Sequence, residues 1–366
     1  MKLGVSAWRL AGQRLGIGRY IEYLLRYWSP ILHGDEVTVF VRESLDLTGT
    51  GMSARVIRPA LTNALWENLL LPRHTKNLDV LFGPSYTLPL RPGCRSVVAI
   101  HSVDELHGTV PWWHRHTYEQ KYRWSAKTAD RVIANSHYVK QRLVRIYGVP
   151  AEKIDVVWLG ADDVFRPLDD PALLRETRRK YLGSDRPFIL FMGGLSQRRN
   201  IPVLLEAFSI LKKKDRIPHA LLLMGPNRAN IPLGDLSARL GIADSVVHTV
   251  GQVAHHSELV PVYCAADAYV LPSSSEGFSL TLAEAMACGT PVITVNRAAL
   301  GEVAHGYGLT IEEPSVDALT DALRRVLGDP NLQAELSRKG LERARELRWT
   351  EAARRTLEVL RQVANS

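Results

Sequence analysis

Two series of short hydrophobic runs follow one another along the chain. Each series alternates with stretches whose apolar residues recur at helical spacing, which predicts a parallel sheet covered by helices. The predicted strands of the first series are 3–8, 36–41, 79–83, 95–101, 130–135 and 154–160. Those of the second series are 187–194, 219–225, 245–251, 267–272 and 290–295.

Helical patterns fill the intervals and the end of the chain. In the first series they cover 17–29, 63–76, 112–128 and 137–147. Later they cover 200–214, 256–265, 280–288, 315–328, 331–347 and 349–364. The polar segment 160–171 interrupts the alternation, and its last residues, Asp170 and Pro171, suit the N-cap and first position of a helix.

The chain therefore predicts an α/β protein with two doubly wound, Rossmann-like domains. We place the first at 1–165 and the second at 166–345, followed by a terminal helical segment at 346–366. A length of 366 residues agrees with two domains. Ligands of such sheets bind outside the carboxyl ends of the strands, so a site is expected there.

Composition narrows the class of protein. Hydrophobic residues make up 46% and charged residues 23%, which is typical of a folded chain. No apolar run approaches the ~20 residues that span a bilayer, and Arg9 and Arg14 interrupt the start of the chain where a secretory signal would be apolar. The three cysteines are far apart, which argues against a disulfide framework or a cysteine zinc site. We expect a cytoplasmic protein.

The net charge of +8 lies entirely in the first half. Residues 1–160 hold 21 Lys and Arg against 13 Asp and Glu, whereas the remainder holds 25 of each. Within the basic half, 112–128 interleaves aromatic residues with Arg115, Lys121, Arg123 and Lys127. This pattern suits an anionic membrane surface, single-stranded nucleic acid, or an ordinary helix with solvated cations. Of the two possible ligands, we favour an anionic membrane over nucleic acid.

The densest chemical signal is 273–293, directly after a predicted strand. Glu276 and Glu284 are separated by seven residues, and Gly277 lets the backbone approach a ligand. The residues Phe278, Ser279 and Leu280 then lead into a helix, whose free N–H groups suit a diphosphate. Two structural alternatives stay open. Glu276 could be a solvated loop residue, and Thr281-x-x-Glu284 also matches a capping box.

Two glycine-containing turns follow the first strands of the two series. The turn with Gly16 and Gly18 lacks the third glycine of a dinucleotide fingerprint, because Ile21 stands there. It suits either a close-approach loop near a diphosphate or a plain β–α turn. The second turn is followed by Arg198 and Arg199, which could grip a phosphate or simply be exposed.

Taken together, 273–293 resembles the E-x7-E region of the retaining family 4 glycosyltransferases, which have the GT-B fold. Other stretches occur in that family's order, and the resemblance extends over nearly the whole chain. They are 16–20, 66–72, the strand end at His101, 131–143, 156–167, 193–200, 251–253 and 347–360.

The resemblance implies roles for residues of the second half. Glu276 would contact the donor sugar and Glu284 the donor ribose, while the N–H groups of Phe278, Ser279 and Leu280 would approach the sugar and the diphosphate. Arg198 and Arg199 would neutralise the diphosphate, and Val253 would meet the nucleobase through its backbone. Arg199 stands where the family usually has lysine. Some members have arginine where this chain has Gly194, so one phosphate contact is missing here.

For the first half the resemblance implies an acceptor-binding domain. His101 would reach the transferred sugar, although a histidine at a strand end is more often a structural residue. Trp349 resembles the tryptophan before the last helix, which in this family packs back on the first domain. No metal and no cofactor are expected, because arginines and helix dipoles replace the cation.

The resulting hypothesis is a retaining, metal-independent hexosyltransferase. It would move a hexose, with mannose as first guess, from a nucleotide-diphosphate sugar to a sugar or lipid-linked sugar acceptor in polysaccharide or glycolipid assembly. The enzyme would be cytoplasmic or peripheral on the inner face of the plasma membrane. The alternatives are a GT-B epimerase or phosphorylase, and a membrane-docked sugar-nucleotide binding protein without catalysis.

Overall fold

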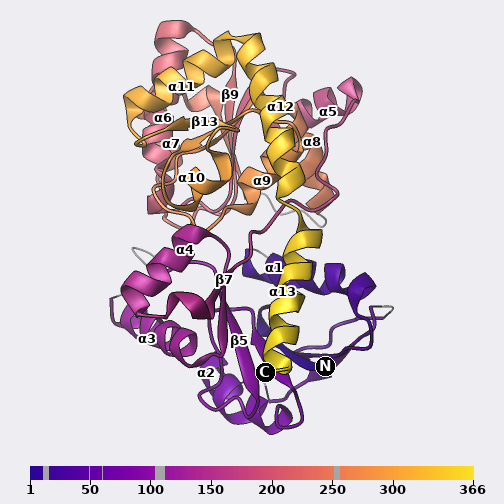
Figure 1. Ribbon diagram of the computed structural model, residues 1–366. Coiled ribbons are helices and arrows are strands. Elements are labelled where there is room, and N and C mark those ends of the chain that lie inside the picture. Colours follow the sequence, from indigo (N-terminus) through magenta and orange to yellow (C-terminus); the bar gives the residue numbers. More distant parts are fainter. Residues whose placement is uncertain (11–15, 49, 60, 104–111, 251–255) are drawn as a thin grey trace. The chain divides into compact units, whose positions relative to one another are not determined.

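The computed structural model describes the chain except residues 11–15, 49, 60, 104–111 and 251–255, and for 112–115 it describes the backbone alone. The chain divides into two compact units (Figure 1). Unit 1 comprises Met1–Leu159 and Trp349–Ser366, and unit 2 comprises Gly160–Arg348.

Unit 1 is built on a parallel sheet in the order β3-β2-β1-β4-β5-β6-β7. The six strands predicted from hydrophobic runs are present, and β3 is an addition at the edge. It escaped prediction because four of its five residues are exposed, so it forms no apolar run. The strands are β1 Lys2–Ser6, β2 Glu36–Val41, β3 Met52–Val56, β4 Val80–Gly83, β5 Arg95–Ile100, β6 Arg131–Ala134 and β7 Ile154–Val156.

Helices cover this sheet on both faces. The stretch predicted as one helix at 63–76 is α2 continued by a π-helical and a 3-10 turn, and the stretch at 137–147 is α4 continued by a π-helical turn. A buried cluster that includes Trp66, Tyr122 and Val139 joins these elements to the sheet. The helices are α1 Ile17–Trp28, α2 Asn63–Leu65, α3 Trp112–Thr128, α4 His137–Arg142 and α13 Trp349–Ala364.

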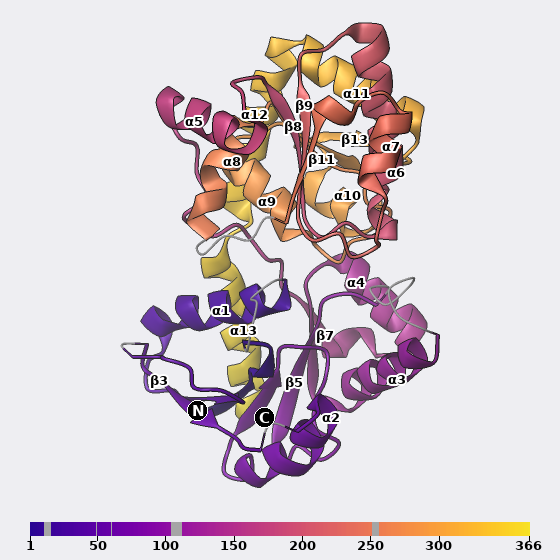
Figure 2. The same cartoon turned by 180° about the vertical axis from the view of Figure 1, so that it is seen from behind.

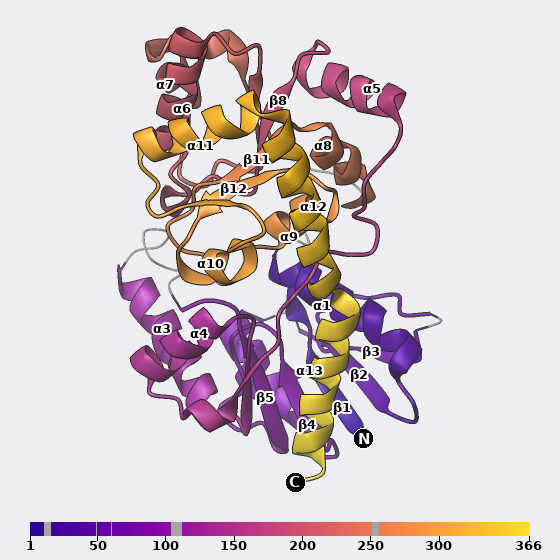
Figure 3. The same ribbon diagram turned by 45° about the horizontal axis from the view of Figure 1, so that its top comes forward.

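The C-terminal helix α13 packs on α1 and on the central strands β4, β5 and β6 of unit 1 (Figure 3). Trp349 is fully buried against the rings of Tyr20 and Tyr23. Trp28 donates its indole N–H to the carbonyl of Ala353 at 2.9 Å. The terminal helix is therefore an integral part of the first unit.

Unit 2 has a second parallel sheet in the order β10-β9-β8-β11-β12-β13. The five predicted strands are present. Strand β13 escaped prediction because it has three residues, all only half-buried. The strands are β8 Phe188–Met192, β9 Ala220–Met224, β10 Val246–Thr249, β11 Ala268–Leu271, β12 Val292–Val295 and β13 Leu309–Ile311.

The helices of unit 2 lie in two layers (Figure 2). On one face of the sheet α5 packs on α8, α8 on α9, and α9 on α12. On the other face α6 packs with α7 and α11. Asp170 caps α5 as predicted, since its carboxylate accepts from the N–H groups of Ala172 and Leu173. The helices are α5 Pro171–Leu182, α6 Ile201–Ile210, α7 Leu233–Arg239, α8 Val260–Ala265, α9 Leu280–Ala287, α10 Ala298–Ala304, α11 Val316–Gly328 and α12 Pro330–Glu346.

The unit boundaries differ from the predicted 1–165, 166–345 and 346–366. Residues 160–165 belong to unit 2, because the N–H of Ala161 donates to the carbonyl of Leu347 and Phe165 packs on Tyr263. At Gly160 a Cβ would lie 2.2 Å from the carbonyl oxygen of Leu347, so this close approach of two chain segments requires glycine. The chain therefore passes from unit 1 to unit 2 between residues 159 and 160, and it returns to unit 1 between residues 348 and 349.

Candidate functional site

The sheet of unit 2 reverses its strand order at β8 and β11. From β8 the chain continues to its neighbour β9, and from β11 it continues in the opposite direction to β12. The segments that leave β8 and β11 therefore start side by side at the carboxyl edge of the sheet. Such a switch point is where open α/β sheets bind ligands.

Hydrogen bonds join these two segments to each other. The carbonyl of Arg198 accepts from the backbone N–H of Ser274 at 2.8 Å and from its hydroxyl at 3.1 Å. The side-chain amide of Asn200 donates to the carbonyl of Pro272 at 2.8 Å. Hydrogen bonds at Arg198 and at Asn200 thus fix the position of the two arginines relative to Glu276.

Glu276 lies between the two arginines. Its Oε1 accepts from Arg199 Nε at 3.0 Å and from the hydroxyl of Ser273 at 3.1 Å, and its Oε2 lies 3.0 Å from Nη1 of Arg198. The glutamate is buried, whereas both arginine side chains keep some exposure. The predicted alternative of a solvated loop glutamate is wrong.

The protonation of Glu276 follows from these neighbours. Burial by itself raises the pKa of this carboxyl, but the charges of Arg199 and Arg198 and the hydrogen bonds from Arg199 and Ser273 more than offset it, and the pKa lies below its usual value. Glu276 is therefore a carboxylate at neutral pH. It neutralises one of the two adjacent positive charges.

The turn after β8 has room for Arg199 only because Gly193 has no side chain. A Cβ at Gly193 would lie 2.1 Å from Arg199 Nη1, and the residue has φ +132°. The same Nη1 donates to the carbonyl of Gly194 at 2.9 Å. The guanidinium of Arg199 therefore bridges the turn after β8 and the carboxylate that follows β11.

The predicted backbone segment leads from Glu276 into α9. Gly277 and Phe278 are buried, and Ser279 and Leu280 are partly exposed. Ser279 is the N-cap, with φ +82° and its hydroxyl accepting from the N–H of Leu282. The first N–H groups of α9 have no acceptor within the helix, as at every helix start, so this end of α9 suits an anion.

The capping-box alternative for Glu284 is wrong. The helix begins at Leu280 with Ser279 as its N-cap, so the N3 position of a capping box is residue 282 and Glu284 lies two residues beyond it. Its carboxylate is instead buried and accepts from the hydroxyl of Tyr263 at 2.8 Å. The Thr281 hydroxyl lies 2.8 Å from the hydroxyl of Tyr269.

Three further candidate residues, His101, Gly16 and Gly18, lie in unit 1. His101 follows β5, contacts the rings of Tyr20 and Tyr86, and places Nε2 2.8 Å from the carbonyl of Pro84. Gly16 is the N-cap of α1 with φ +51°, and Gly18 is buried in the first turn of that helix. These three residues are thus in a different unit from Arg198, Arg199 and Glu276.

On α3, Lys121, Arg123 and Lys127 are exposed, as the surface hypothesis requires. Arg123 and Lys127 are four residues apart and share a helix face, whereas Lys121 points about 200° away from Arg123. Val253 lies outside the described residues, and so does the side chain of Arg115.

Sequence reasoning missed one buried carboxyl in unit 1. Glu67 follows Trp66 on the π-helical turn and accepts from the hydroxyl of Thr87 at 2.8 Å. Burial raises the pKa of the Glu67 carboxyl to about 7, against the Thr87 hydrogen bond and the charges of Lys121 and Arg42. The motif 66–72 was recognised, but nothing in its spacing indicated that this glutamate is buried.

Within the described residues, no cluster of three or more His, Cys, Asp or Glu side chains could hold a metal ion. Nor does that part of the chain contain a helix with the length and apolar character needed to cross a bilayer.

Two family models match the chain, one in each half. Residues 15–165 match Glycosyltransferase Family 4, and residues 175–343 match Glycosyl transferases group 1.

Curated relatives carry glycosyltransferase names. O-antigen chain mannosyltransferase B of Escherichia coli is 27% identical over 282 residues, which are 76% of this chain and 73% of that protein. The D-inositol 3-phosphate glycosyltransferases of Gordonia bronchialis and Rhodococcus jostii are 33% and 34% identical over 60% and 64% of this chain. Those two alignments span 50% and 52% of the relatives, so the chain matches about half of their length.

Solved structures share the fold over the whole chain. Sucrose-phosphate synthase from Thermosynechococcus elongatus has a TM-score of 0.78 at 21% identity and covers 100% of both chains. HepE of Anabaena, in complex with UDP-glucose, has a TM-score of 0.77 at 16% identity and covers 99% of both chains. The predicted architecture of two Rossmann-like domains is confirmed. With a glycosyltransferase model matched in each half and this fold throughout, the chain belongs to the family 4-like glycosyltransferases of the GT-B fold.

Proposed function

We propose that this glycosyltransferase transfers a hexose from a nucleotide-diphosphate sugar with retention of configuration and without a metal ion, and that unit 2 binds the donor. The observation that carries the proposal is the cluster of Arg198, Arg199 and Glu276 at the switch point of the unit 2 sheet, directly before the start of α9.

The chemistry requires that negative charge developing on the departing diphosphate be stabilised. Arg198 and Arg199 together exceed the charge of Glu276 by one, and each guanidinium carries several N–H donors that suit phosphate oxygens. The N–H groups at the start of α9, which have no acceptor within the helix, add a second source of positive potential. In this proposal these groups take the place of a divalent cation.

Glu276 has the position of the residue that faces the donor sugar. Its carboxylate is ionised and accepts hydrogen bonds, so it suits the hydroxyl groups of a hexose. The N–H groups of Gly277, Phe278, Ser279 and Leu280 would lie along the sugar and diphosphate, and Glu284 would hold the ribose. These assignments extend the family resemblance to the contacts of this chain.

The acceptor would bind to unit 1, with His101 near the transferred sugar and the Gly16–Gly18 turn near the diphosphate. Mannose is the first choice of hexose, since the Escherichia coli relative is named a mannosyltransferase. HepE was solved with UDP-glucose, so glucose is the first competitor in an activity screen. We infer a role in polysaccharide or glycolipid assembly from the O-antigen relative's name.

Substitution of Arg199 by alanine tests the donor site. We expect the Kd for a nucleoside diphosphate to rise by about 10- to 100-fold, because a charge-assisted contact to phosphate contributes about 1.5–3 kcal/mol. The Kd for the corresponding nucleoside should change by less than about threefold. Calorimetric titration of both ligands measures the difference, and Arg175→Ala, an exposed arginine on α5, is the matched control.

Equal losses for the diphosphate and the nucleoside would contradict a phosphate contact and indicate general damage to the site. A wild-type protein that binds no nucleoside diphosphate would refute the donor site altogether. Turnover of a nucleotide sugar, measured on the wild-type protein, separates a transferase from a binding protein without catalysis.

The basic surface of unit 1 supports a second proposal: docking on an anionic membrane, where a lipid-linked acceptor would be found. Arg123 and Lys127 form an exposed pair on one face of α3, and each cation near such a surface contributes about 1 kcal/mol. We expect the protein to sediment with phosphatidylserine vesicles at low salt and to be released at high salt.

Arg123→Glu combined with Lys127→Glu should weaken this sedimentation and leave nucleoside diphosphate binding unchanged. The control is a vesicle of phosphatidylcholine alone, which should not bind. Sedimentation that ignores lipid charge would overturn the membrane proposal without affecting the transferase proposal.

A further inference from the structure

Arg228 is a cation beside the candidate donor site that no motif singled out. It lies after β9, the neighbour of β8 on the side opposite β11. Arg228 is exposed, and within the described part of the chain its side chain makes no ion pair or hydrogen bond. An exposed loop arginine is ordinary by itself, so its significance depends on what it lies against.

Arg228 lies against Gly194. Both Cδ and Nε of Arg228 are 3.4 Å from the position that a Cβ at Gly194 would occupy, and they are the atoms nearest to it. The arginine side chain therefore covers the side of the turn from which a residue at 194 would project. This is the position where some family members have an arginine and this chain has none.

Backbone hydrogen bonds hold Arg228 in this place. The N–H of Leu195 donates to the carbonyl of Pro226 at 2.8 Å, and the N–H of Ala229 donates to the carbonyl of Leu195 at 3.0 Å. Asn227 closes the loop, since its side chain bonds both the N–H and the carbonyl of Ile231. The loop after β9 is thus attached to the turn after β8.

Arg199 also binds this turn, through the carbonyl of Gly194. Arg198 and Arg199 are partly neutralised by Glu276, whereas Arg228 has no such acidic partner among the described residues. Arg228 therefore raises the net charge around the turn from one to two positive charges. A dianionic or more highly charged ligand at this turn would gain most from the second charge.

Resting on the donor site proposed above, we propose that Arg228 is a third cation for the diphosphate of the nucleotide sugar. It supplies, from the loop after β9, the charge that the glycine at position 194 omits. Its guanidinium contacts the diphosphate and not the nucleoside.

The test compares three ligands on one variant. In Arg228→Ala the Kd for a nucleoside diphosphate should rise about 10-fold, the Kd for the monophosphate should rise less, and the Kd for the nucleoside should stay within about twofold. The loss for the diphosphate should diminish as salt rises, because the contact is between charges. Arg175→Ala is again the matched control for an exposed arginine.

A charge relocation sharpens the test. The backbone of Gly194 is not left-handed, so a residue with a side chain can adopt it. The atoms nearest to its Cβ position belong to Arg228 itself. The double variant Gly194→Arg with Arg228→Ala therefore has room for the new side chain. We expect it to recover diphosphate affinity to within about threefold of the wild type. Recovery would show that charge beside this turn, and not the shape of the loop after β9, is what the ligand requires.

Two results would overturn the inference. One is diphosphate affinity in Arg228→Ala equal to that of the wild type, which would leave the donor site at Arg198, Arg199 and Glu276 intact. The other is an equal loss for diphosphate and nucleoside, which would assign Arg228 to loop structure. Failure of the wild-type protein to bind any nucleoside diphosphate would refute the proposed function itself, and so the two failures are distinguishable.

Discussion

Replacement of Glu276 by glutamine is expected to lower the rate of sugar transfer at least a hundredfold while the affinity for a nucleoside diphosphate is kept or increases a few-fold. Both effects have one cause. The carboxylate accepts from Arg199 and Ser273 and pairs with Arg198, so it orients the groups that would surround the sugar and also partly neutralises the cations. Glutamine keeps the shape but removes the charge.

The opposite direction of the two effects makes this prediction specific. A catalytic contact of this kind contributes about 3–4 kcal/mol to transition-state stabilisation, which corresponds to a factor of about 10² to 10³ in rate. Binding of the diphosphate alone should not suffer, because the two arginines are then free of their acidic partner. Rates at saturating donor and calorimetric titration with the nucleoside diphosphate measure the two quantities separately.

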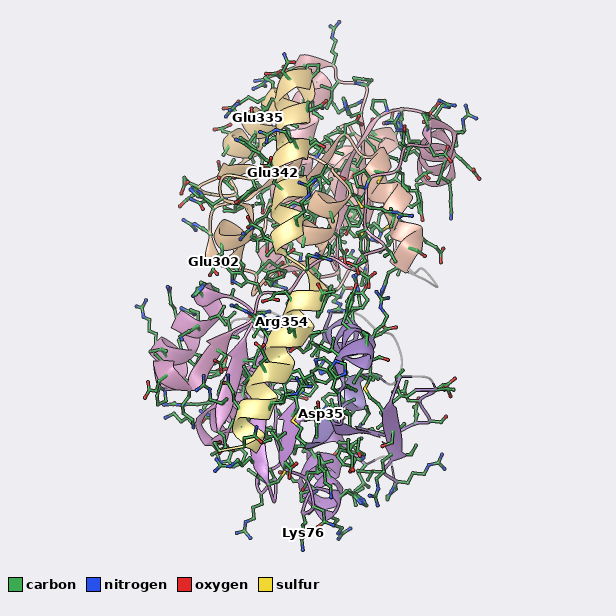
Figure 4. All side chains as sticks on the ribbon, turned by 45° about the vertical axis from the view of Figure 1, so that its right-hand side comes forward. Asp35, Lys76, Glu302, Glu335, Glu342 and Arg354 are labelled. Atoms are coloured by element: carbon green, nitrogen blue, oxygen red, sulfur yellow. The ribbon has the colours of Figure 1, made fainter. Side chains whose placement is uncertain are left out.

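Glu335→Gln is the matched control, since it removes an exposed carboxylate paired with Lys339 on α12 (Figure 4). It should leave both transfer and binding unchanged. Circular dichroism establishes that the Glu276→Gln protein is folded. Transfer at the wild-type rate would show that the Glu276 carboxylate has no part in the reaction, and loss of diphosphate binding in the folded variant would show that it positions the arginines for the ligand.

The approximate position of this cluster could be predicted from two sources. Ligands of doubly wound sheets bind outside the carboxyl ends of the strands, and the family resemblance assigned Arg198, Arg199 and Glu276 to one nucleotide-sugar donor. That Arg198 and Glu276 pair directly could not be predicted. The two residues lie 78 positions apart in the sequence, and their ion pair depends on the hydrogen bonds of Ser274 and Asn200.

Other features failed prediction for local reasons. The capping-box pattern at Thr281 was misleading, because the N-cap of α9 is Ser279, two residues before Thr281. Arg228 and Glu67 could not be recognised from the sequence, because their significance comes from neighbours that only the folded chain supplies. Arg228 lies against Gly194, and Glu67 lies near Thr87 and Arg42. Sequence patterns locate strand ends well and the contacts between loops poorly.

The last prediction concerns stability. Trp349→Ala is expected to lower the free energy of unfolding of unit 1 by about 3–5 kcal/mol, the usual cost of removing a large buried aromatic side chain. Trp349 is fully buried at the first turn of α13, with its ring 5.1 Å from that of Tyr23 and 5.9 Å from that of Tyr20. The cavity would lie between α13 and α1, so the loss falls on the contact that makes the C-terminal helix part of this unit.

Trp349→Phe distinguishes packing from hydrogen bonding. The buried indole N–H of Trp349 has no hydrogen-bond partner among the residues that the structure describes. Phenylalanine removes this donor together with part of the ring, and we expect a loss of only about 1–2 kcal/mol. Arg354→Ala, on the exposed side of the same helix, is the control and should leave unfolding unchanged (Figure 4). Urea unfolding followed by circular dichroism measures all three. Two other interactions attach α13 to this unit: Trp28 bonds the carbonyl of Ala353, and Arg361 pairs with Asp35. A loss below about 1 kcal/mol in Trp349→Ala would show that these two are sufficient to hold α13 in place.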